Sequence, residues 1–99
     1  MEISELEENA TRASDLLKVM ANQSRLMILC HLLKEEQSVQ QLQGRVGLSQ
    51  SALSQQLAIL RGQNLVATRR EAQSVFYSLA SKEAETLIGT LYDLYCATE

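Results

Sequence analysis

The hydrophobic period changes once between residues 38 and 79, and this change limits the folds open to the chain. Up to Gly62, apolar residues recur every three or four positions, which predicts helices. Beyond it, the stretches 65–70 and 74–79 are rich in β-branched and aromatic residues, which predicts two short strands joined by residues 71–73. A length of 99 residues is that of one domain, so we expect a single unit, 1–99, that is mainly α-helical with one β-hairpin.

Capping residues indicate where the helices begin and end. Asn22, Ser38, Ser49 and Ser81 each stand directly before a helical pattern, where a side-chain oxygen can accept from a free backbone N–H. Gly47 suits the left-handed conformation that closes a short helix. We therefore expect four helices, two strands and a last helix, with the helices at about residues 4–20, 22–34, 39–46, 49–62 and 81–95.

The third and fourth predicted helices and the glycine between them form a helix-turn-helix, and the hairpin adds a wing. Along the fourth helix, Leu53, Leu57 and Leu60 fall on one face, while the opposite face carries uncharged hydrogen-bonding side chains. In a winged helix-turn-helix, the short third helix supports the fourth so that its N-terminal half can enter the major groove of duplex DNA. The sequence therefore predicts a DNA-binding domain.

Side chains from the fourth helix and the wing are the candidate DNA contacts. Glutamine can donate and accept toward an adenine edge, serine is less selective, and arginine suits phosphate or the minor groove. The candidates are Ser49, Gln50, Ser51, Ser54, Gln55, Gln56, Arg61, Arg69, Arg70 and Gln73. Of these, Gln55, Arg69 and Arg70 are the strongest. The alternative interpretation is that the polar helical residues are only the solvated face of an amphipathic helix.

The charge distribution favours nucleic acid although the total does not. The formal net charge is -3, but residues 37–70 contain four arginines and no acidic residue, so this segment carries +4 and the rest of the chain -7. Local charge determines attraction to phosphate. The acidic remainder of the chain would discourage indiscriminate binding.

Three stretches together resemble the ArsR (arsenic repressor) family of regulators. They are residues 20–29 (MANQSRLMIL), residues 47–57 (GLSQSALSQQL) followed by Leu60 and Arg61, and residues 70–79 (REAQSVFYSL). The resemblance covers nearly the whole chain. It implies a homodimer built through the first and last helices that binds an imperfect inverted repeat in double-stranded promoter DNA. One position departs from the family pattern, because close relatives usually have histidine where this chain has Gln56.

Metal sensing is common in that family, but the chain offers few ligands for it. The third helix reads Val39-Gln40-Gln41-Leu42-Gln43 where metal-sensing members carry Cys-x-Cys, and His31 is the only histidine. Soft metals need clustered thiolates, and zinc needs several converging ligands. We therefore expect no metal and no cofactor, and keep a metal-responsive repressor as an alternative.

The two cysteines resemble those of the sulfide- and redox-responsive branch of the family. That resemblance implies that Cys30 and Cys96 react with reactive sulfur species or oxidants and become joined by a disulfide or polysulfide bridge that lowers operator affinity. Packing alone would also explain Cys30, which lies on an apolar stripe. A sensing thiol needs a lowered pKa, and Arg25 or Lys34 could provide this for Cys30.

Other functions and locations are less consistent with the sequence. A thiol-redox enzyme would need Cys-x-x-Cys, which is absent. The acidic N-terminus is unlike a signal peptide, and no apolar run approaches the ~20 residues of a membrane span, so we expect a cytoplasmic protein without membrane contact. A redox-independent activator or anti-repressor of virulence-type genes, and a module for protein contacts, remain alternatives.

Overall fold

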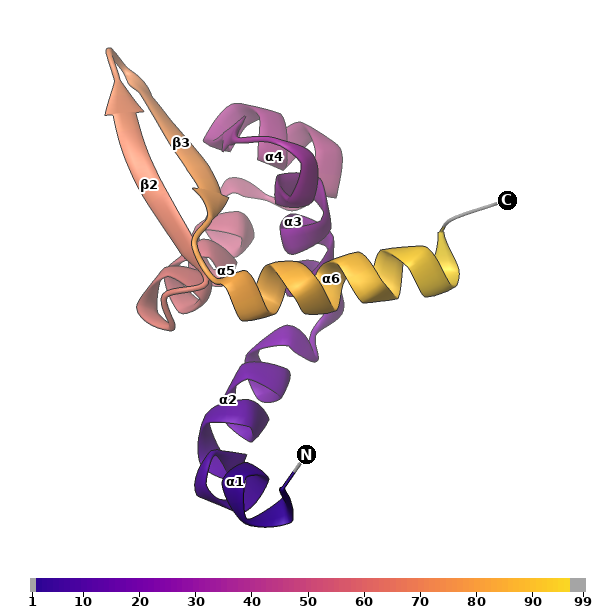
Figure 1. Ribbon diagram of the computed structural model, residues 1–99. Helices are drawn as coiled ribbons and strands as arrows, with labels where there is room; N and C mark the ends of the chain where they lie inside the picture. The colour runs from indigo at the N-terminus through magenta and orange to yellow at the C-terminus, as the bar shows by residue number, and fades with distance from the viewer. Residues whose placement is uncertain (1, 97–99) are drawn as a thin grey trace.

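The computed structural model describes residues 2–96, which form helices around one core and a small antiparallel sheet (Figure 1). In chain order the elements are α1 Ile3–Glu8, α2 Ala10–Met20, α3 Gln23–Lys34, β1 Gln37–Ser38, α4 Val39–Val46, α5 Gln50–Gly62, β2 Val66–Glu71, β3 Ser74–Leu79 and α6 Lys82–Tyr95. The predicted fold class is confirmed: the chain is mostly helical and carries a hairpin wing. None of the helices within residues 2–96 has the length and apolarity needed to cross a bilayer.

The first predicted helix is two helices, because the chain breaks at Asn9. The side-chain amide of Asn9 donates to the carbonyl oxygen of Glu5 at 2.9 Å, which is the acceptor that its own backbone N–H would use in a continuous helix. The Asn9 N–H bonds instead to Leu6 O at 3.0 Å, and α1 ends there. The single helix over residues 4–20 was therefore a wrong prediction.

The sheet has the strand order β1-β3-β2, with both pairs antiparallel. Strand β1 was not predicted, since two residues are too few to show a period. The wing strand β2 begins at Val66 and runs to Glu71, one residue later than expected at both ends. Glu71 lies opposite Ser74, so the turn contains two residues, Ala72 and Gln73, rather than three, and Ala72 adopts a φ of 57°.

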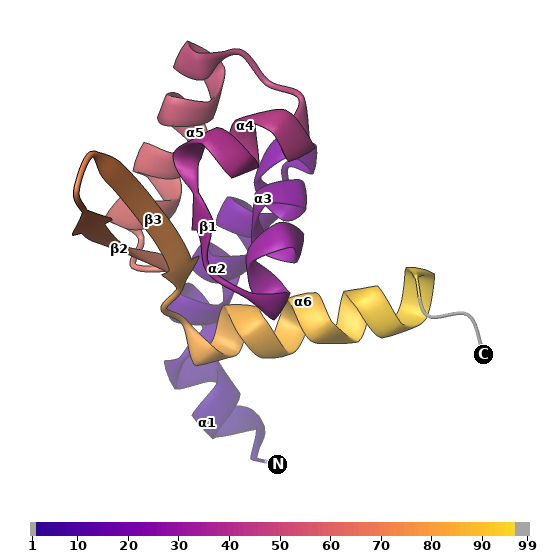
Figure 2. The same ribbon diagram turned by 90° about the horizontal axis from the view of Figure 1, so that it is seen from above.

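Helix α3 lies at the centre of the core. It packs against α6, α4, β3, α5 and α2, and α6 crosses its base in both ribbon views (Figures 1 and 2). The buried apolar residues are Met20, Ile28, Leu29, Leu32, Leu42, Leu53, Leu57, Leu60, Leu65, Val66, Ala84 and Ile88. Helix α3 contacts both the helix-turn-helix and α6. A movement of α6 against α3 would therefore also change the packing of α5 on α3.

Candidate nucleic-acid interface

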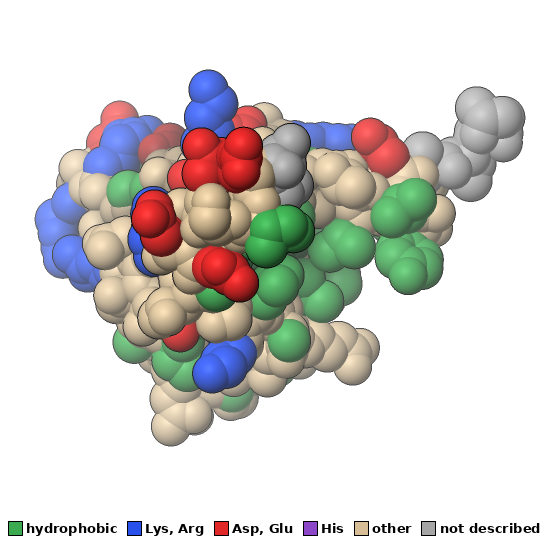
Figure 3. All heavy atoms as spheres, turned by 60° about the horizontal axis from the view of Figure 1, so that its bottom comes forward, with side chains coloured by type: hydrophobic (Ala, Val, Ile, Leu, Met, Phe, Trp, Pro, Cys, Tyr) green, Lys and Arg blue, Asp and Glu red, His purple; other side chains and the backbone are tan. Residues whose placement is uncertain are grey.

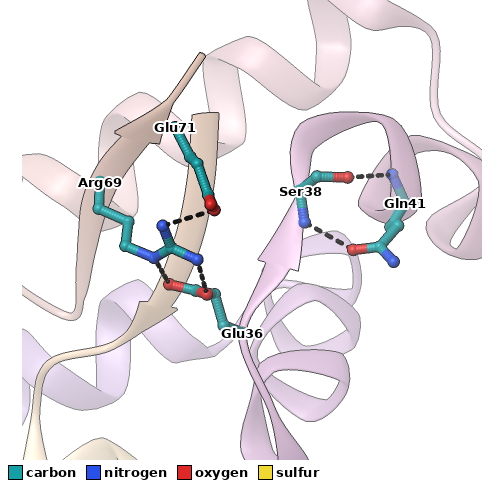
Figure 4. Close-up of polar contacts among 5 residues, drawn as sticks. All are labelled: Glu36, Ser38, Gln41, Arg69 and Glu71. Atoms are coloured by element: carbon teal, nitrogen blue, oxygen red, sulfur yellow. Dashed lines mark hydrogen bonds and ion pairs between the residues drawn. The ribbon is translucent and has the colours of Figure 1, made fainter. Parts of the chain in front are cut away.

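Helix α4 is fixed at its start by a reciprocal pair of hydrogen bonds. The Ser38 hydroxyl accepts from Gln41 N at 3.1 Å, and the Gln41 side-chain oxygen accepts from Ser38 N at 2.8 Å (Figure 4). Two backbone donors that a helix N-terminus leaves free are thereby satisfied. Leu42 is fully buried beneath this helix. The capping box and the buried leucine together hold α4 as a short brace for α5.

The turn between α4 and α5 has the predicted chemistry. Gly47 ends α4 in the left-handed conformation, with φ 78° and ψ 26°. Ser49 then caps α5, its hydroxyl accepting from Ala52 N at 3.2 Å. A side chain with a Cβ would be strained at that φ. The direction in which α5 leaves the turn is thus determined by these two residues.

The N-terminal half of α5 presents a free polar face. Leu53, Leu57 and Leu60 are buried as predicted, and the opposite face is exposed. The exposed candidates on this helix are Gln50, Ser51, Ser54, Gln55 and Arg61. Within residues 2–96, the side chains of Gln50 and Gln55 make no hydrogen bond or ion pair, so their donors and acceptors are open to a ligand. This geometry suits base-edge contacts in a major groove.

Gln56 differs from the other α5 candidates. It is half-buried, and its Oε1 accepts from Arg25 Nη1 on α3 at 3.0 Å. Arg25 also donates through Nε to Val19 O, so its guanidinium is committed to these two acceptors. The sequence predicted that Gln56 contacts DNA and that Arg25 or Lys34 could lower the pKa of the Cys30 thiol. The structure brings the side chains of Gln56 and Arg25 together instead.

Arg61 lies on the last turn of α5, two turns after Ser54. Both line a shallow cleft between α5 and the wing, together with Tyr77 of β3. The predicted phosphate contact at Arg61 therefore lies beside the hairpin, away from the N-terminal end of the helix. The tyrosine was not among the predicted candidates.

The guanidinium of Arg69 is held by two carboxylates. Its Nε and Nη2 donate to Glu36 at 2.7 and 2.8 Å, and its Nη1 donates to Glu71 at 3.0 Å (Figure 4). The same group lies 4.6 Å from the centre of the Phe76 ring. The hydrogen bond from Arg69 holds the pKa of the Glu36 carboxyl below its usual range, and the pKa of Arg69 is raised mainly by Glu36. The expectation of an arginine free for DNA does not match this arrangement.

The other wing candidates remain free. Arg70 follows Arg69 on β2, so its side chain leaves the opposite face of the strand. It is exposed, as is Gln73 in the turn, and neither side chain has a polar partner among the residues that the structure describes. No local pattern in the sequence indicates that Glu36 pairs with Arg69 and leaves Arg70 free, because Glu36 and Arg69 are 33 positions apart.

The two cysteines lie on helices that pack together, α3 and α6. Cys30 is half-buried, and Cys96 is exposed at the end of α6. Burial raises the pKa of the Cys30 thiol, and the charge of Cys96 raises it further. One turn beyond Cys30, Lys34 Nζ lies 5.8 Å from the ring centre of Tyr92, which is one turn before Cys96.

The environment of Cys30 corrects the expectation about its pKa. Neither Arg25 nor Lys34 lowers its pKa, which shifts in the opposite direction. Among residues 2–96, no group of three or more His, Cys, Asp or Glu side chains is arranged to hold a metal ion. The packing of α3 against α6 thus involves the helices of two thiols, of which Cys96 is the more accessible.

The chain belongs to the ArsR family. Residues 22–68 match the family described as "Bacterial regulatory protein, arsR family". The chain is 55% identical to transcriptional activator HlyU of Vibrio cholerae over 97% of its own length and 89% of that protein, and 52% identical to nodulation protein NolR of Rhizobium meliloti over 92% and 75%. It is therefore a transcriptional regulator, of a family that binds DNA.

Solved structures agree with this assignment. The structure of reduced HlyU from Vibrio cholerae superposes with a TM-score of 0.91 at 55% identity, covering 96% of this chain and all of that one. The transcriptional repressor BigR from Xylella fastidiosa gives a TM-score of 0.92 at 38% identity, covering 99% and 100%. The winged helix described above is therefore the fold of these regulators.

Proposed function

We propose that this chain is a homodimeric repressor of promoter DNA that releases its operator when Cys30 and Cys96 become joined. The observation that supports this proposal is that the two free thiols lie on helices that pack against each other, Cys30 on α3 and Cys96 at the end of α6. One relative is described as reduced HlyU and another as a transcriptional repressor, which supports a redox-linked repressor here. The signal is a reactive sulfur species or an oxidant.

Dimerisation is supported by apolar side chains left exposed on the first and last helices. They are Ile3, Leu6 and Leu17 on α1 and α2, and Tyr92, Leu94 and Tyr95 on α6. Leu94 is 70% and Tyr95 82% exposed, and apolar side chains gathered on one exposed face mark an interaction surface. Figure 3 shows hydrophobic side chains gathered on the face that carries these helices. A second copy of the chain would cover this face through a two-fold interface.

In such a dimer, DNA is read by two copies of α5. The free N-terminal faces enter successive major grooves about 34–36 Å apart, each facing one half of an imperfect inverted repeat. Gln50 and Gln55 read base edges, with Ser49, Ser51 and Ser54 beside them. Arg61, Arg70 and Gln73 contact the backbone or the minor groove. Arg69 joins them only if phosphate replaces Glu36.

The thiol chemistry begins at the more accessible sulfur, that of Cys96. Its thiolate takes the outer sulfur of a low-molecular-weight persulfide and releases that molecule's thiolate. Cys30 then loses its proton to solvent, and its sulfur attacks the Cys96 sulfur of the new persulfide, forming the disulfide and releasing hydrosulfide. If Cys30 is also persulfidated, its terminal sulfur attacks instead and leaves a trisulfide. With peroxide, Cys96 becomes a sulfenic acid with loss of hydroxide, and condensation with the Cys30 thiol releases water.

Bridging would change DNA affinity through the dimer. A covalent link fixes the end of α6 against α3, and α6 belongs to the proposed dimer face. A small change in the separation of the two α5 helices weakens both half-sites together, since the symmetric sites are engaged at once. Couplings of about 1–3 kcal/mol, or about 5–150-fold in affinity, are typical of such linked sites.

The test compares the wild type with Cys30→Ser and Cys96→Ser. Each protein is treated with glutathione persulfide or with peroxide, and one sample is divided between intact mass spectrometry and operator binding. The wild type should lose affinity as a bridged species forms, and dithiothreitol should restore it. Both serine variants should keep the affinity of the reduced protein. Release of DNA by either treated variant would contradict the proposal.

The order of the two steps can be tested by alkylation with iodoacetamide. Cys96 should react first because it is exposed, and the raised pKa of Cys30 keeps it protonated as the thiol at neutral pH. Labelling of Cys30 should accelerate only as the pH rises above the usual thiol range. Peptide mapping after timed quenching, in Cys96→Ser and Cys30→Ser, separates the two rates. Faster labelling of Cys30 at pH 7 would reverse the order proposed above.

A second candidate function is a redox-independent activator or anti-repressor, because the relative with 55% identity is named a transcriptional activator. Such a protein would displace another repressor from shared DNA rather than block transcription itself. Its operator affinity would not change on treatment with persulfide or peroxide. Transcription from its promoter in vitro, with the polymerase alone, distinguishes the two: a repressor lowers the signal, and an anti-repressor leaves it unchanged.

A further inference from the structure

Arg25 lies on α3, and its side chain connects this helix to two others, α2 and α5. It lies in the first turn of α3, where its backbone N–H donates to the Asn22 cap at 3.0 Å. Its side chain is partly buried and bonds to Val19 O in the last turn of α2 and to Gln56 Oε1 in the middle of α5. The sequence motif that contains Arg25 is therefore also a structural junction.

The bond to Val19 completes the end of α2. The carbonyls of the last turn of a helix have no intrahelical donor, and here Leu17 O accepts from Ala21 N while Met20 O accepts from Asn22 N. Val19 O lies between them and takes the Arg25 Nε–H. A guanidinium at a helix C-terminus is also favoured by the helix dipole.

The hydrogen bond from Arg25 to Gln56 holds α5 on the face that is turned toward the core. Gln56 is half-buried, unlike its neighbour Gln55, and its acceptor oxygen is occupied by Arg25 Nη1. Because guanidinium nitrogens lie in one plane at fixed angles, one arginine holds two acceptors in a defined relation. Lysine carries its charge at a single nitrogen and cannot reproduce both directions.

We propose that Arg25 is a positioning residue for DNA recognition: through Val19 and Gln56 it fixes the orientation of α5 relative to α2. This inference rests on the proposed function, because α2 belongs to the proposed dimer face and α5 carries the reading side chains. In a two-fold dimer, a rotation of α5 on α2 displaces both reading faces from their half-sites. Gln56 is then the α5 end of this clamp and reads no base.

Positioning affects specific binding more than non-specific binding. Hydrogen bonds to base edges form only when the exposed polar face of α5 is correctly positioned in the groove. Electrostatic attraction to phosphate tolerates small displacements of the helix. Loss of the clamp should therefore lower the ratio of operator affinity to affinity for unrelated DNA. A role in stability alone would lower both affinities through the folded fraction and leave that ratio unchanged.

The experiment uses the full chain and an operator duplex selected from a random pool by the wild type, with a scrambled duplex of equal composition as reference. Fluorescence anisotropy at one salt concentration gives both affinities for Arg25→Lys and Gln56→Leu. We expect each variant to lose about tenfold or more on the operator, in line with loss of a hydrogen bond to a charged group, and to change less than about twofold on the scrambled duplex.

Two further variants control for charge and folding. Gln56→Glu keeps an acceptor for Arg25 and should retain operator affinity within a few-fold of the wild type. Arg45→Lys makes the same chemical change at an exposed arginine that has no partner within residues 2–96, and should leave the ratio unchanged. Thermal unfolding of every variant establishes that the folded protein is being compared.

The combination Arg25→Lys with Gln56→Leu tests whether the two residues act together. If they form one clamp, the double variant loses no more than either single variant, because the second change removes a bond already broken. Additive losses, or a changed base preference in Gln56→Leu alone on reselection from the pool, would overturn the inference and make Gln56 a reader. If the wild type itself selected no duplex, the proposed function would fail before the clamp was tested.

Discussion

Helix α5 and the wing were predicted to contact DNA on the same kind of evidence, but their side chains are in different states. On α5, Gln50 and Gln55 are exposed and have no polar partner in the described part of the chain. In the wing, Arg69 is also exposed, but it is held by Glu36 and Glu71. The polar side chains of α5 are thus free to contact DNA. Of the two arginines on β2, Arg69 is already paired with acidic side chains of the same chain.

This difference between α5 and the wing follows from the sequence separation of the residues that interact in each. The cap at Ser49 joins residues three apart, so the sequence reveals it. The ion pair between Arg69 and Glu36 joins residues 33 apart, and no local pattern predicts it. Glu36 and Glu71 stand directly outside the segment 37–70 that lacks acidic residues, so the charge of +4 counted along the chain is partly neutralised in space.

The largest expected effect on operator affinity is at Gln55, on the unpaired polar face of α5. Gln55→Ala removes a donor and an acceptor that have no internal role, so operator affinity should fall by about 1–3 kcal/mol while thermal stability stays the same. Discrimination at one base position of each half-site should relax as well. Anisotropy titrations on single-base operator variants measure both quantities.

Gln63→Ala provides the matched control for Gln55→Ala. Gln63 is also exposed, but it caps the other end of α5 and lies away from the reading face. It should bind the operator as the wild type does. If Gln55→Ala also bound normally, the polar face of α5 would be only a solvated surface, which is the alternative that the sequence left open.

The fold was predictable where local chemistry decides it. The caps at Asn22, Ser38, Ser49 and Ser81 are all present, and α4 has the expected bounds. The break at Asn9 was missed, because an asparagine that competes for a helical carbonyl looks like any polar surface residue. Strand β1 was missed because its two residues become a strand only by pairing with β3.

The site was predictable in its composition but not in its pairings. The sequence identified which face of α5 is polar, and the family resemblance identified Cys30 and Cys96 as the candidate pair of thiols. It could not show that Gln56 turns toward Arg25, because Gln55 and Gln56 are chemically identical and differ only by about 100° around the helix. Exposed apolar residues such as Leu17 and Tyr95 follow the same helical period as core residues, so periodicity alone does not separate a core from an interface.

A smaller effect, on the salt dependence of DNA affinity, should distinguish Arg70 from Arg69. Arg70→Gln removes a free charge, so the slope of log affinity against log salt should become shallower by about 1, and binding should weaken on all duplexes alike. Arg69→Gln should change the slope much less, because its charge is already paired in the free protein. Equal changes for both variants would mean that DNA displaces Glu36 from Arg69 on binding.

The smallest effect concerns the acidic partner itself. Glu36→Gln leaves Arg69 paired with Glu71 alone and therefore freer to contact phosphate, so affinity for unrelated duplex should rise by roughly twofold to fivefold, the range expected for an exposed ion pair. Since the pKa of Glu36 is lowered in the folded protein, the ion pair is intact at neutral pH and is lost as the pH falls through that lowered value. In the wild type, the Arg69 Nε–H resonance should therefore shift on acidification, and in Glu36→Gln this step should be absent. A pH step that persists unchanged in Glu36→Gln would contradict the assignment of that step to the Glu36 carboxyl.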